Sequence, residues 1–240
     1  MEWYRLTQKE IEKELKLSSK EGLSLEHVEK NRQEFGENEL QSQNKKSIWL
    51  IFIIQFQDFL VMILLAATLI AGLLGEYIDA IAIMLIVVLN GCIGFFQEHR
   101  AEKSLEKLKE LSAPHMRVLR QGKWLTLPAK EAVVGDVVQI TAGDRVPADI
   151  RIVQANHLET EESMLTGESI PVTKCEQALQ EVNLSIQEQK NMAFKSTLVT
   201  KGNGIGIVVQ TGMDTEVGKI ASLMDETEEV ATPLEVKLKE

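Results

Sequence analysis

The chain has 240 residues, which is enough for one or two domains. Its 36 Asp and Glu residues outnumber its 26 Lys and Arg residues, and the net charge is −10. This acidic balance argues against nucleic-acid partners, because non-specific binding to nucleic acid needs a basic surface that neutralises phosphates.

The cysteines and the short motifs exclude several kinds of site. Cys92 lies in an apolar run and Cys175 in a polar stretch, so we expect no disulfide. The sequence contains no Cys-x-x-Cys, no His-Glu-x-x-His and no Gly-x-x-x-x-Gly-Lys. A zinc site and a P-loop are therefore unsupported, and we predict no cofactor-binding residues in this chain.

Residues 1–46 predict two short amphipathic helices on the cytoplasmic side. Thr7 can cap the first helix, with Glu10 three residues later completing a capping box. Ser24 can cap the second, and Gly36 ends it. The segment is charged and has no apolar core, so we expect no cleavable signal peptide.

Residues 47–113 predict a transmembrane hairpin and a stalk. The apolar runs at about 48–74 and 77–96 are each long enough to cross the roughly 30 Å hydrocarbon core as a helix. Only Gly75 and Glu76 clearly separate them, which favours a tight antiparallel hairpin. The alternative is a buried helical pair in a soluble protein, but such helices usually show a polar face.

Positive charge flanks the outer ends of both runs, whereas the turn between them has acidic residues and no Lys or Arg. The positive-inside rule then places both termini in the cytoplasm and makes this a multi-pass protein of the cell membrane. Gln57 and Asp58 lie near the cytoplasmic end of the first span. They are candidates for an ion path, or they lie at the interface and snorkel into water.

The second span is expected to continue into the cytoplasm as a helix. Leu105, Leu108 and Leu111 recur at helical spacing between charged residues, and Pro114 ends the pattern. An unbroken helix of this kind could act as a lever, or it could simply connect two domains.

Residues 114–224 predict a mostly β domain, a compact sandwich or distorted jelly roll with a few helices. Expected strands cover Met116–Leu119, Trp124–Leu125, Val137–Val138 and Ile150–Val153. Ser196–Val199 and Ile205–Val209 predict a late hairpin with its turn at residues 201–204. Asp214 or Thr215 can cap a closing helix, and residues 225–240 predict an acidic linker toward a third span. The fold class is therefore mixed.

Thr166-Gly167-Glu168-Ser169 is the candidate functional motif. Glycine beside a carboxylate allows backbone to approach a ligand while the acid reaches into the site. A short run such as this is often an ordinary polar turn, so its meaning depends on the membrane spans upstream.

The ordered motifs resemble the N-terminal part of the type II P-type cation-transporting ATPases, with bacterial calcium pumps most similar in general appearance. The matching segments run along nearly the whole chain: Phe35-Gly36 with Asn38-Glu39-Leu40, Gln97-Glu98, Gly135-Asp136, Gly143 to Asp149, Glu162-Ser163, Leu165 to Ser169, Pro171-Val172, Thr211-Gly212 and Gly218 to Ile220.

The resemblance implies that residues 114–224 are an actuator domain. In that family a separate domain carries an aspartate that ATP phosphorylates, with Mg²⁺ as cofactor, and the actuator loop then meets the aspartyl phosphate. By resemblance, Glu168 orients and polarises the attacking water, Gly167 permits close approach, and Thr166 and Ser169 hold the loop or the water. Pro147 and Asp149 are expected to brace the domain.

The sequence departs from the family by lacking Asp-Lys-Thr-Gly-Thr, and it carries Gln57 where animal calcium pumps have glutamate. We therefore expect a truncated pump that is inactive alone. Its partners would be the bilayer, the missing phosphorylation and nucleotide-binding domains, the remaining membrane helices and a transported cation, with Ca²⁺ favoured. The alternatives are a pump for another cation, a non-enzymatic membrane-anchored regulatory module, and a stand-alone membrane hydrolase.

Overall fold

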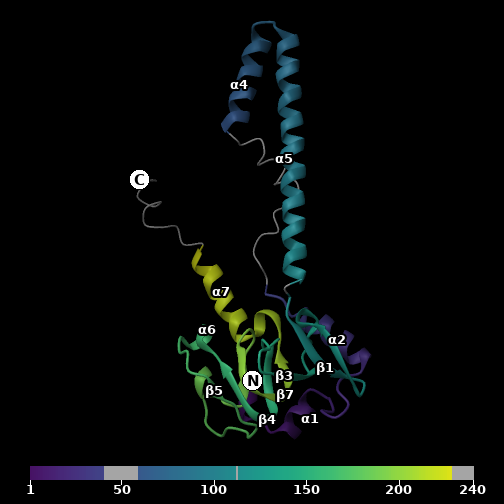
Figure 1. Ribbon diagram of the computed structural model, residues 1–240, viewed down its shortest axis with the longest axis vertical. Helices are drawn as coiled ribbons and strands as arrows, with labels where there is room; N and C mark the ends of the chain where they lie inside the picture. The colour runs from purple at the N-terminus through teal and green to yellow at the C-terminus, as the bar shows by residue number, and fades with distance from the viewer. Residues whose placement is uncertain (41–58, 112, 229–240) are drawn as a thin grey trace. The chain divides into compact units, whose positions relative to one another are not determined.

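The computed structural model describes residues 1–40, 59–111 and 113–228. The chain divides into two compact units (Figure 1). One unit combines Met1–Gln41 with Pro114–Glu240, and the other is Ser42–Ala113. The N-terminal helices, which the sequence pattern marked as a division of their own, therefore belong with the β domain.

The Ser42–Ala113 unit contains the antiparallel helices α4 (Phe59–Leu73) and α5 (Tyr77–Leu111), which pack against each other. Val61 of α4 and Val87 of α5 are both buried. α5 is continuous over 35 residues, so the expected run of the second apolar segment into a stalk is confirmed. The first apolar run is helical from Phe59, and its earlier part, with Gln57 and Asp58, lies outside the described residues.

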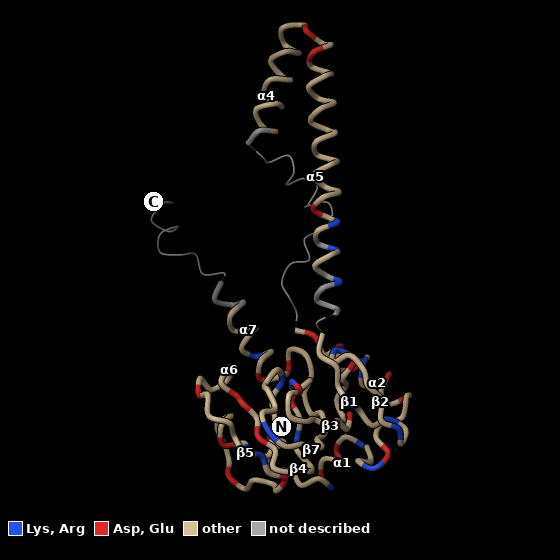
Figure 2. The backbone as a smooth tube through the Cα atoms, viewed as in Figure 1, with Lys and Arg blue, Asp and Glu red and all other residues tan. Residues whose placement is uncertain are grey.

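The surface of α5 is apolar over its first half. Ile78 is 84% exposed and Ile81 is 69% exposed, and most of the apolar side chains as far as Phe96 are exposed as well. Within the described residues, Tyr77–Leu105 is the helical segment that is long and apolar enough to cross a membrane. Glu76 in the turn before α5 and Asp79 in the first turn of α5 are acidic, and Lys and Arg appear only in the later half of the helix (Figure 2).

The other unit is built on antiparallel strands. They are β1 (His115–Arg120), β2 (Lys123–Pro128), β3 (Val137–Thr141), β4 (Asp149–Glu161), β5 (Val172–Thr173), β6 (Met192–Ala193) and β7 (Leu198–Gln210). In the described part of the chain they form one seven-stranded sheet in the order β2-β1-β3-β7-β4-β5, with β6 also paired to β4. The expected mixed fold and the β1–β2 hairpin, with its turn at Gln121 and Gly122, are confirmed.

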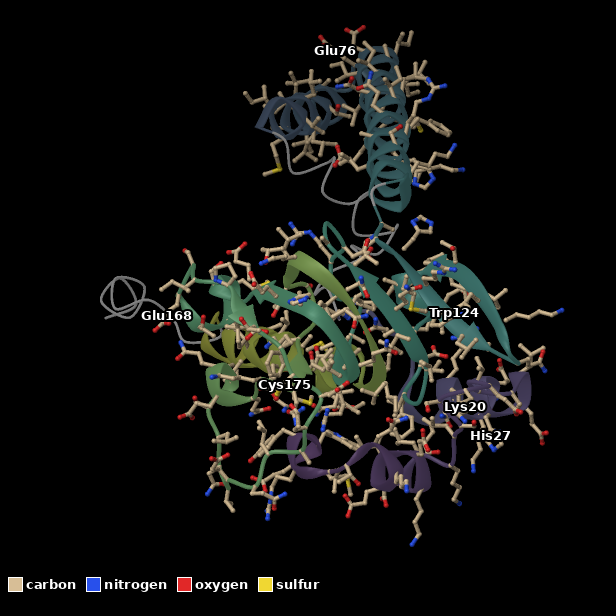
Figure 3. The ribbon with its side chains drawn as sticks, turned by 60° about the horizontal axis from the view of Figure 1, so that its bottom comes forward. Lys20, His27, Glu76, Trp124, Glu168 and Cys175 are labelled. Carbon is tan, nitrogen blue, oxygen red and sulfur yellow. The ribbon has the colours of Figure 1, made fainter. Side chains whose placement is uncertain are left out.

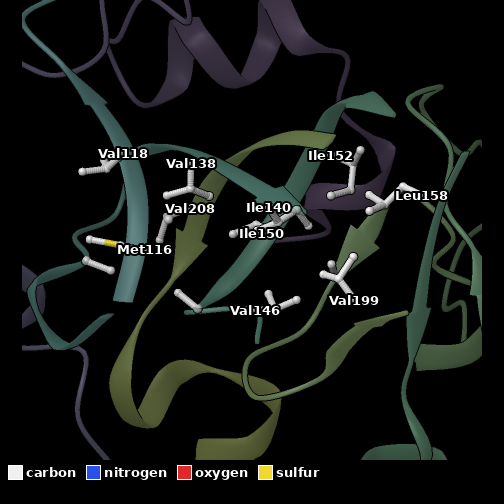
Figure 4. Close-up of a cluster of buried hydrophobic side chains, with 13 residues drawn as sticks. Met116, Val118, Val138, Ile140, Val146, Ile150, Ile152, Leu158, Val199 and Val208 are labelled. Atoms are coloured by element: carbon white, nitrogen blue, oxygen red, sulfur yellow. The ribbon is translucent and has the colours of Figure 1, made fainter. Parts of the chain in front are cut away.

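Apolar side chains fill both faces of this sheet, because successive residues of a strand point to opposite sides. Val138 and Ile150 contribute to one core, which Figure 4 shows in close-up. Their neighbour Val137 joins a second core with Ile207 and Ile11 of the N-terminal segment. The N-terminal segment thus forms a layer over the second face and is not a detached arm.

The N-terminal helices begin and end where local sequence signals place them. α1 (Gln8–Glu14) starts with the Thr7–Glu10 capping box, in which the Thr7 N–H donates to Glu10 Oε2 over 2.8 Å. α2 (Leu25–Phe35) starts at Ser24, whose hydroxyl accepts from the His27 N–H. Gly36, with φ of 75°, ends α2. All three predicted caps are confirmed.

The predicted late hairpin is wrong. Residues 201–204 lie inside β7, which runs unbroken beside β4. A Cβ on Gly202 would meet the His157 carbonyl oxygen at 2.2 Å, and one on Gly204 would meet the Gln154 carbonyl oxygen at 2.8 Å. These glycines allow β4 and β7 to approach closely where their pairing is irregular. In the sequence, glycines with this role look the same as glycines in a turn.

Asn38 joins the N-terminal segment to the β domain. Its Nδ2 donates to the carbonyl oxygens of Ala129 (2.8 Å) and Pro147 (2.7 Å). Its Oδ1 accepts from Lys195 Nζ (2.7 Å) and from the Gly212 N–H (3.0 Å). The side chain is only 4% exposed, so this one amide uses its full hydrogen-bonding capacity inside the domain.

We predict that Asn38→Ala lowers the free energy of unfolding by about 2–4 kcal/mol, since it leaves several buried polar groups without a partner. Urea unfolding of the whole chain in detergent, followed by tryptophan fluorescence, measures this loss. Asn31→Ala is the matched control, because Asn31 makes one hydrogen bond, from Nδ2 to the Val134 carbonyl, and should cost only about 0.5–1.5 kcal/mol. Equal losses in the two variants would contradict the proposed importance of Asn38.

Candidate functional site

The candidate motif lies on a short excursion between two paired strands. β4 ends at Glu161, the short helix α6 (Ser163–Thr166) follows, and the chain returns through β5. β5 pairs back onto β4, with Thr173 opposite Glu159 and Val172 opposite Thr160. The ends of the excursion are therefore fixed by the sheet, and its tip projects from it.

The tip is shaped by Thr166 and Gly167. Thr166 Oγ1 donates to the Glu162 carbonyl oxygen (3.1 Å) and accepts from the Glu168 N–H (3.2 Å). Gly167 ends α6 in the left-handed region with φ of 77°, where glycine is favoured. A Cβ on Gly167 would meet no atom within 4 Å, so a side chain would have room at this position. The positive φ therefore explains why glycine is favoured here.

The side chains of Glu168 and Ser169 are exposed. Glu168 lies at the periphery of the β domain (Figure 3). Its carboxylate is therefore accessible to a partner or to water. Of the four motif residues, the structure gives Thr166 and Gly167 a part in holding the loop, and it presents Glu168 at the tip.

A buried ion pair beneath the loop was not found by sequence reasoning. Lys174 Nζ lies 2.5 Å from Glu162 Oε1, and both side chains are almost fully buried. Thr160 Oγ1 donates to the same carboxylate oxygen over 2.9 Å. Burial lowers the pKa of Lys174, and the Glu162 charge partly opposes that shift.

A signal for this pair was present in the sequence. Leu158 and Thr160 near the end of β4, and Glu162 just after it, lie at alternate positions, and all three are buried. An acidic residue that continues an inward-facing alternation requires a buried partner. The sequence does not say which of the many lysines supplies it.

No group of three or more His, Cys, Asp or Glu side chains in the described ranges is arranged to hold a metal ion. Gln57 and Asp58 stand outside these ranges, so their part in an ion path stays a prediction. Cys92 and Cys175 are free thiols.

Comparison with known proteins bears on the whole chain. The family model of the P-type ATPase actuator domain matches residues 110–225, and that of the cation transporter/ATPase N-terminus matches residues 3–71. The calcium-transporting ATPase of Bacillus subtilis (strain 168) is 50% identical over all 240 residues. The chain belongs to the P-type cation-transporting ATPases.

Other relatives in this ATPase family differ in the ion that they are named for. Calcium-transporting ATPase 1 of Bacillus cereus is 40% identical over 98% of the chain. P-type sodium-transporting ATPase4 of Plasmodium falciparum is also 40% identical, over 90% of the chain. The chain spans 27% of the length of each Bacillus relative and 17% of the Plasmodium one.

Within this actuator domain, Asp149 braces the start of the closing helix α7 (Glu216–Glu228), the role expected for it. Asp149 is fully buried, and its carboxylate accepts from the Lys195 N–H and the Glu216 N–H, both over 2.8 Å. Thr215 Oγ1 accepts from the Gly218 N–H and caps the same turn, whereas Asp214 lies before the helix. The described part of α7 ends at Glu228, four residues beyond the predicted end of the domain at residue 224.

Burial raises the pKa of the Asp149 carboxyl from its ordinary 3.8 to about 6, although the two N–H donors lower it. The carboxyl thus binds its proton more tightly in the folded domain than in the unfolded chain. Its protonation stabilises the fold fully below about pH 4, and this contribution is lost as the pH rises through about 6.

We therefore predict that the stability of the unmodified chain, measured relative to Asp149→Asn, falls by roughly 3 kcal/mol between pH 4 and pH 7. Denaturant unfolding of both proteins at several pH values measures this difference. The amide in the variant cannot titrate, while every other carboxyl is common to the two proteins. Parallel stability curves would refute the assignment to Asp149.

Proposed function

We propose that this chain is the N-terminal and actuator part of an ATP-driven cation pump that lies in the cell membrane. The observation that carries the proposal is the exposed Glu168 carboxylate, presented by a loop whose backbone is held by Thr166 and Glu162. The family membership of the chain and the apolar surface of α5 support it.

In the proposed reaction, Glu168 acts on a phosphorylated aspartate carried by a domain outside these 240 residues. The carboxylate accepts a proton from a water molecule while the water oxygen bonds to phosphorus. The bond between phosphorus and the aspartyl oxygen breaks, which releases inorganic phosphate and restores the aspartate carboxylate. Correct placement of the water in line with the breaking bond supplies much of the acceleration.

ATP and Mg²⁺ are assigned to the same absent domain. The phosphorylation motif Asp-Lys-Thr-Gly-Thr does not occur in this chain. ATP would supply the phosphoryl group that the aspartate carries. Of the two phosphoryl-transfer steps, the residues of this chain would contribute to the later one, the hydrolysis of the aspartyl phosphate.

The proposed coupling to transport follows from covalent linkage. α5 ends at Leu111 and β1 begins at His115, so three residues, 112–114, lie between the second helix of the hairpin and the β domain. A rotation of the actuator domain would pull or tilt α5 through this short connection. The motion would open or close access for the ion, with both flanking ends of the hairpin in the cytoplasm.

Ca²⁺ is the favoured transported ion, because the Bacillus relatives that match nearly all of the chain are named as calcium-transporting. The sodium-transporting relative from Plasmodium keeps a different cation as the alternative. Gln57 and Asp58 are the residues of this chain that we propose for the ion path. The ion-binding residues of the remaining spans would decide the selectivity.

The first test uses a complete pump in which this chain replaces the matching residues of the Bacillus subtilis relative. We predict that Glu168→Gln still forms phosphoenzyme from labelled ATP but hydrolyses it about 10²–10⁴-fold more slowly, because the amide cannot accept the proton. Glu176→Gln is the control, since Glu176 is another exposed carboxylate, two residues after Lys174 in the chain. Normal hydrolysis in Glu168→Gln would remove Glu168 from its proposed role.

The second test interrupts the stalk of the same pump. Seven Gly and Ser residues inserted after Leu111 should leave ATP hydrolysis but reduce ion uptake per ATP by about 10-fold or more, because a flexible segment transmits little force. Seven Ala residues are the control, since they add about two helical turns and preserve the helix. Unchanged uptake with the flexible insert would contradict the lever.

A further inference from the structure

The excursion that carries Glu168 is closed at its base by two buried charges. Glu162 follows the last residue of β4, and Lys174 follows β5, so each stands at one end of the loop. Their 2.5 Å contact joins these ends inside the domain, where the side chains are 1% and 0% exposed. Because the pair is shielded from solvent, salt screens it little.

Stability alone does not account for this pair. Removing two charges from water is costly, and well-packed apolar residues of similar volume often stabilise a fold equally well. In the described structure Glu162 Oε2 accepts no hydrogen bond, which adds to the cost of burying the carboxylate. What an ion pair offers beyond apolar packing is a defined geometry between its two partners.

A continuous series of contacts leads from this pair to Glu168. The Glu162 carbonyl oxygen accepts from the Leu165 N–H (2.9 Å), the Thr166 N–H (3.1 Å) and Thr166 Oγ1 (3.1 Å). Thr166 Oγ1 in turn accepts from the N–H of Glu168 (3.2 Å). The Glu162 side chain is thus held by Lys174 and Thr160, while the Glu162 carbonyl oxygen holds the loop through Leu165 and Thr166.

We propose that Glu162 and Lys174 are positioning residues for Glu168, and that their buried ion pair fixes the loop in the conformation that hydrolyses the phosphoenzyme. This inference rests on the proposed function of Glu168. The pair touches neither water nor phosphate in this role. It acts through the Glu162 carbonyl oxygen and Thr166.

The test variant is Glu162→Gln/Lys174→Met, which removes both charges and keeps an acceptor for the Thr160 hydroxyl. In the complete pump we expect normal phosphoenzyme formation and about 10- to 100-fold slower hydrolysis, the size of effect that a small misplacement of a catalytic group produces. Combined with Glu168→Gln, the double substitution should slow hydrolysis no further, because it acts through Glu168.

The matched control is Arg120→Met/Asp136→Asn, which removes another buried ion pair of the same domain. Arg120 Nη2 lies 2.6 Å from Asp136 Oδ2, and neither residue belongs to the loop. This control should lower the stability of the domain without a selective effect on hydrolysis. Equal slowing of hydrolysis in both double variants would overturn the proposal, because it would show a general structural effect.

Hydrogen exchange in the 240-residue chain provides a measurement that does not need the pump. The test variant should exchange the amides of Leu165, Thr166 and Gly167 about 10-fold faster, while the rest of the sheet keeps its protection. The control variant should lower protection across the sheet and have no particular effect on the loop. Unchanged loop exchange in the test variant would refute the positioning role.

Thr160→Val covers the case in which the double variant does not fold. This nearly isosteric change removes the hydrogen bond to Glu162 Oε1 and leaves both charges in place. It should slow hydrolysis several-fold with normal phosphorylation, and an unchanged rate would count against the proposal.

The variants separate the two proposals. If Glu168→Gln hydrolyses the phosphoenzyme normally, the proposed function fails. If Glu168→Gln is slow while the variants of the ion pair are normal, only the positioning role fails.

Discussion

The long antiparallel pairing of β4 with β7 is the constraint on which the rest of the actuator domain depends. Both strands have 13 residues, and they pair from Asp149 opposite Gln210 to Glu161 opposite Leu198. A strand of this length spans roughly 40 Å when extended. β4 therefore connects the buried start of α7, at Asp149, with the base of the Glu168 loop, at Glu162.

This arrangement separates a packed frame from an exposed tip that carries Glu168. The frame holds its elements by burial of apolar side chains on both faces of the sheet and by ladder hydrogen bonds. At the tip, Met164 and Ile170 are 55% and 77% exposed, whereas Leu165 packs partly against a core cluster. The conformation of the tip also depends on one hydroxyl, one left-handed glycine and an ion pair beneath it. A partner can thus reach the tip while the frame stays folded.

Several buried charges in this domain lie at or next to the ends of elements, where the chain changes direction. Arg120, the last residue of β1, pairs with Asp136, which precedes β3. Asp149 begins β4 and accepts hydrogen bonds from the start of α7. Glu162 and Lys174 close the loop between β4 and β5. Each such group is costly to bury, and Arg120, Asp136 and Asp149 are held by directional hydrogen bonds that apolar packing does not provide.

The sequence by itself determined the local elements, because their causes lie within a few residues. The Thr7–Glu10 box, the Ser24 cap and the Gly36 stop follow from backbone groups that need partners at helix ends. The unbroken helix from Tyr77 was predicted from its apolar run and the helical spacing of the leucines that follow. Glu168 was singled out as a candidate site residue by an ordered set of short motifs.

Only the tertiary structure decided the features that join distant segments. Lys201–Gly204 has the composition of a turn, but it forms strand because it pairs with β4. Gly202 and Gly204 lack a side chain and so let the β4 backbone pack close to them. Asn38 was part of a matching motif, but only the fold brings its four hydrogen-bond partners together from elsewhere in the chain. Lys174 was one of many lysines, and the return of β5 onto β4 selected it as the partner of Glu162. Such choices depend on which backbone and charged groups the fold places next to each other, and that information is not contained in local propensity or periodicity.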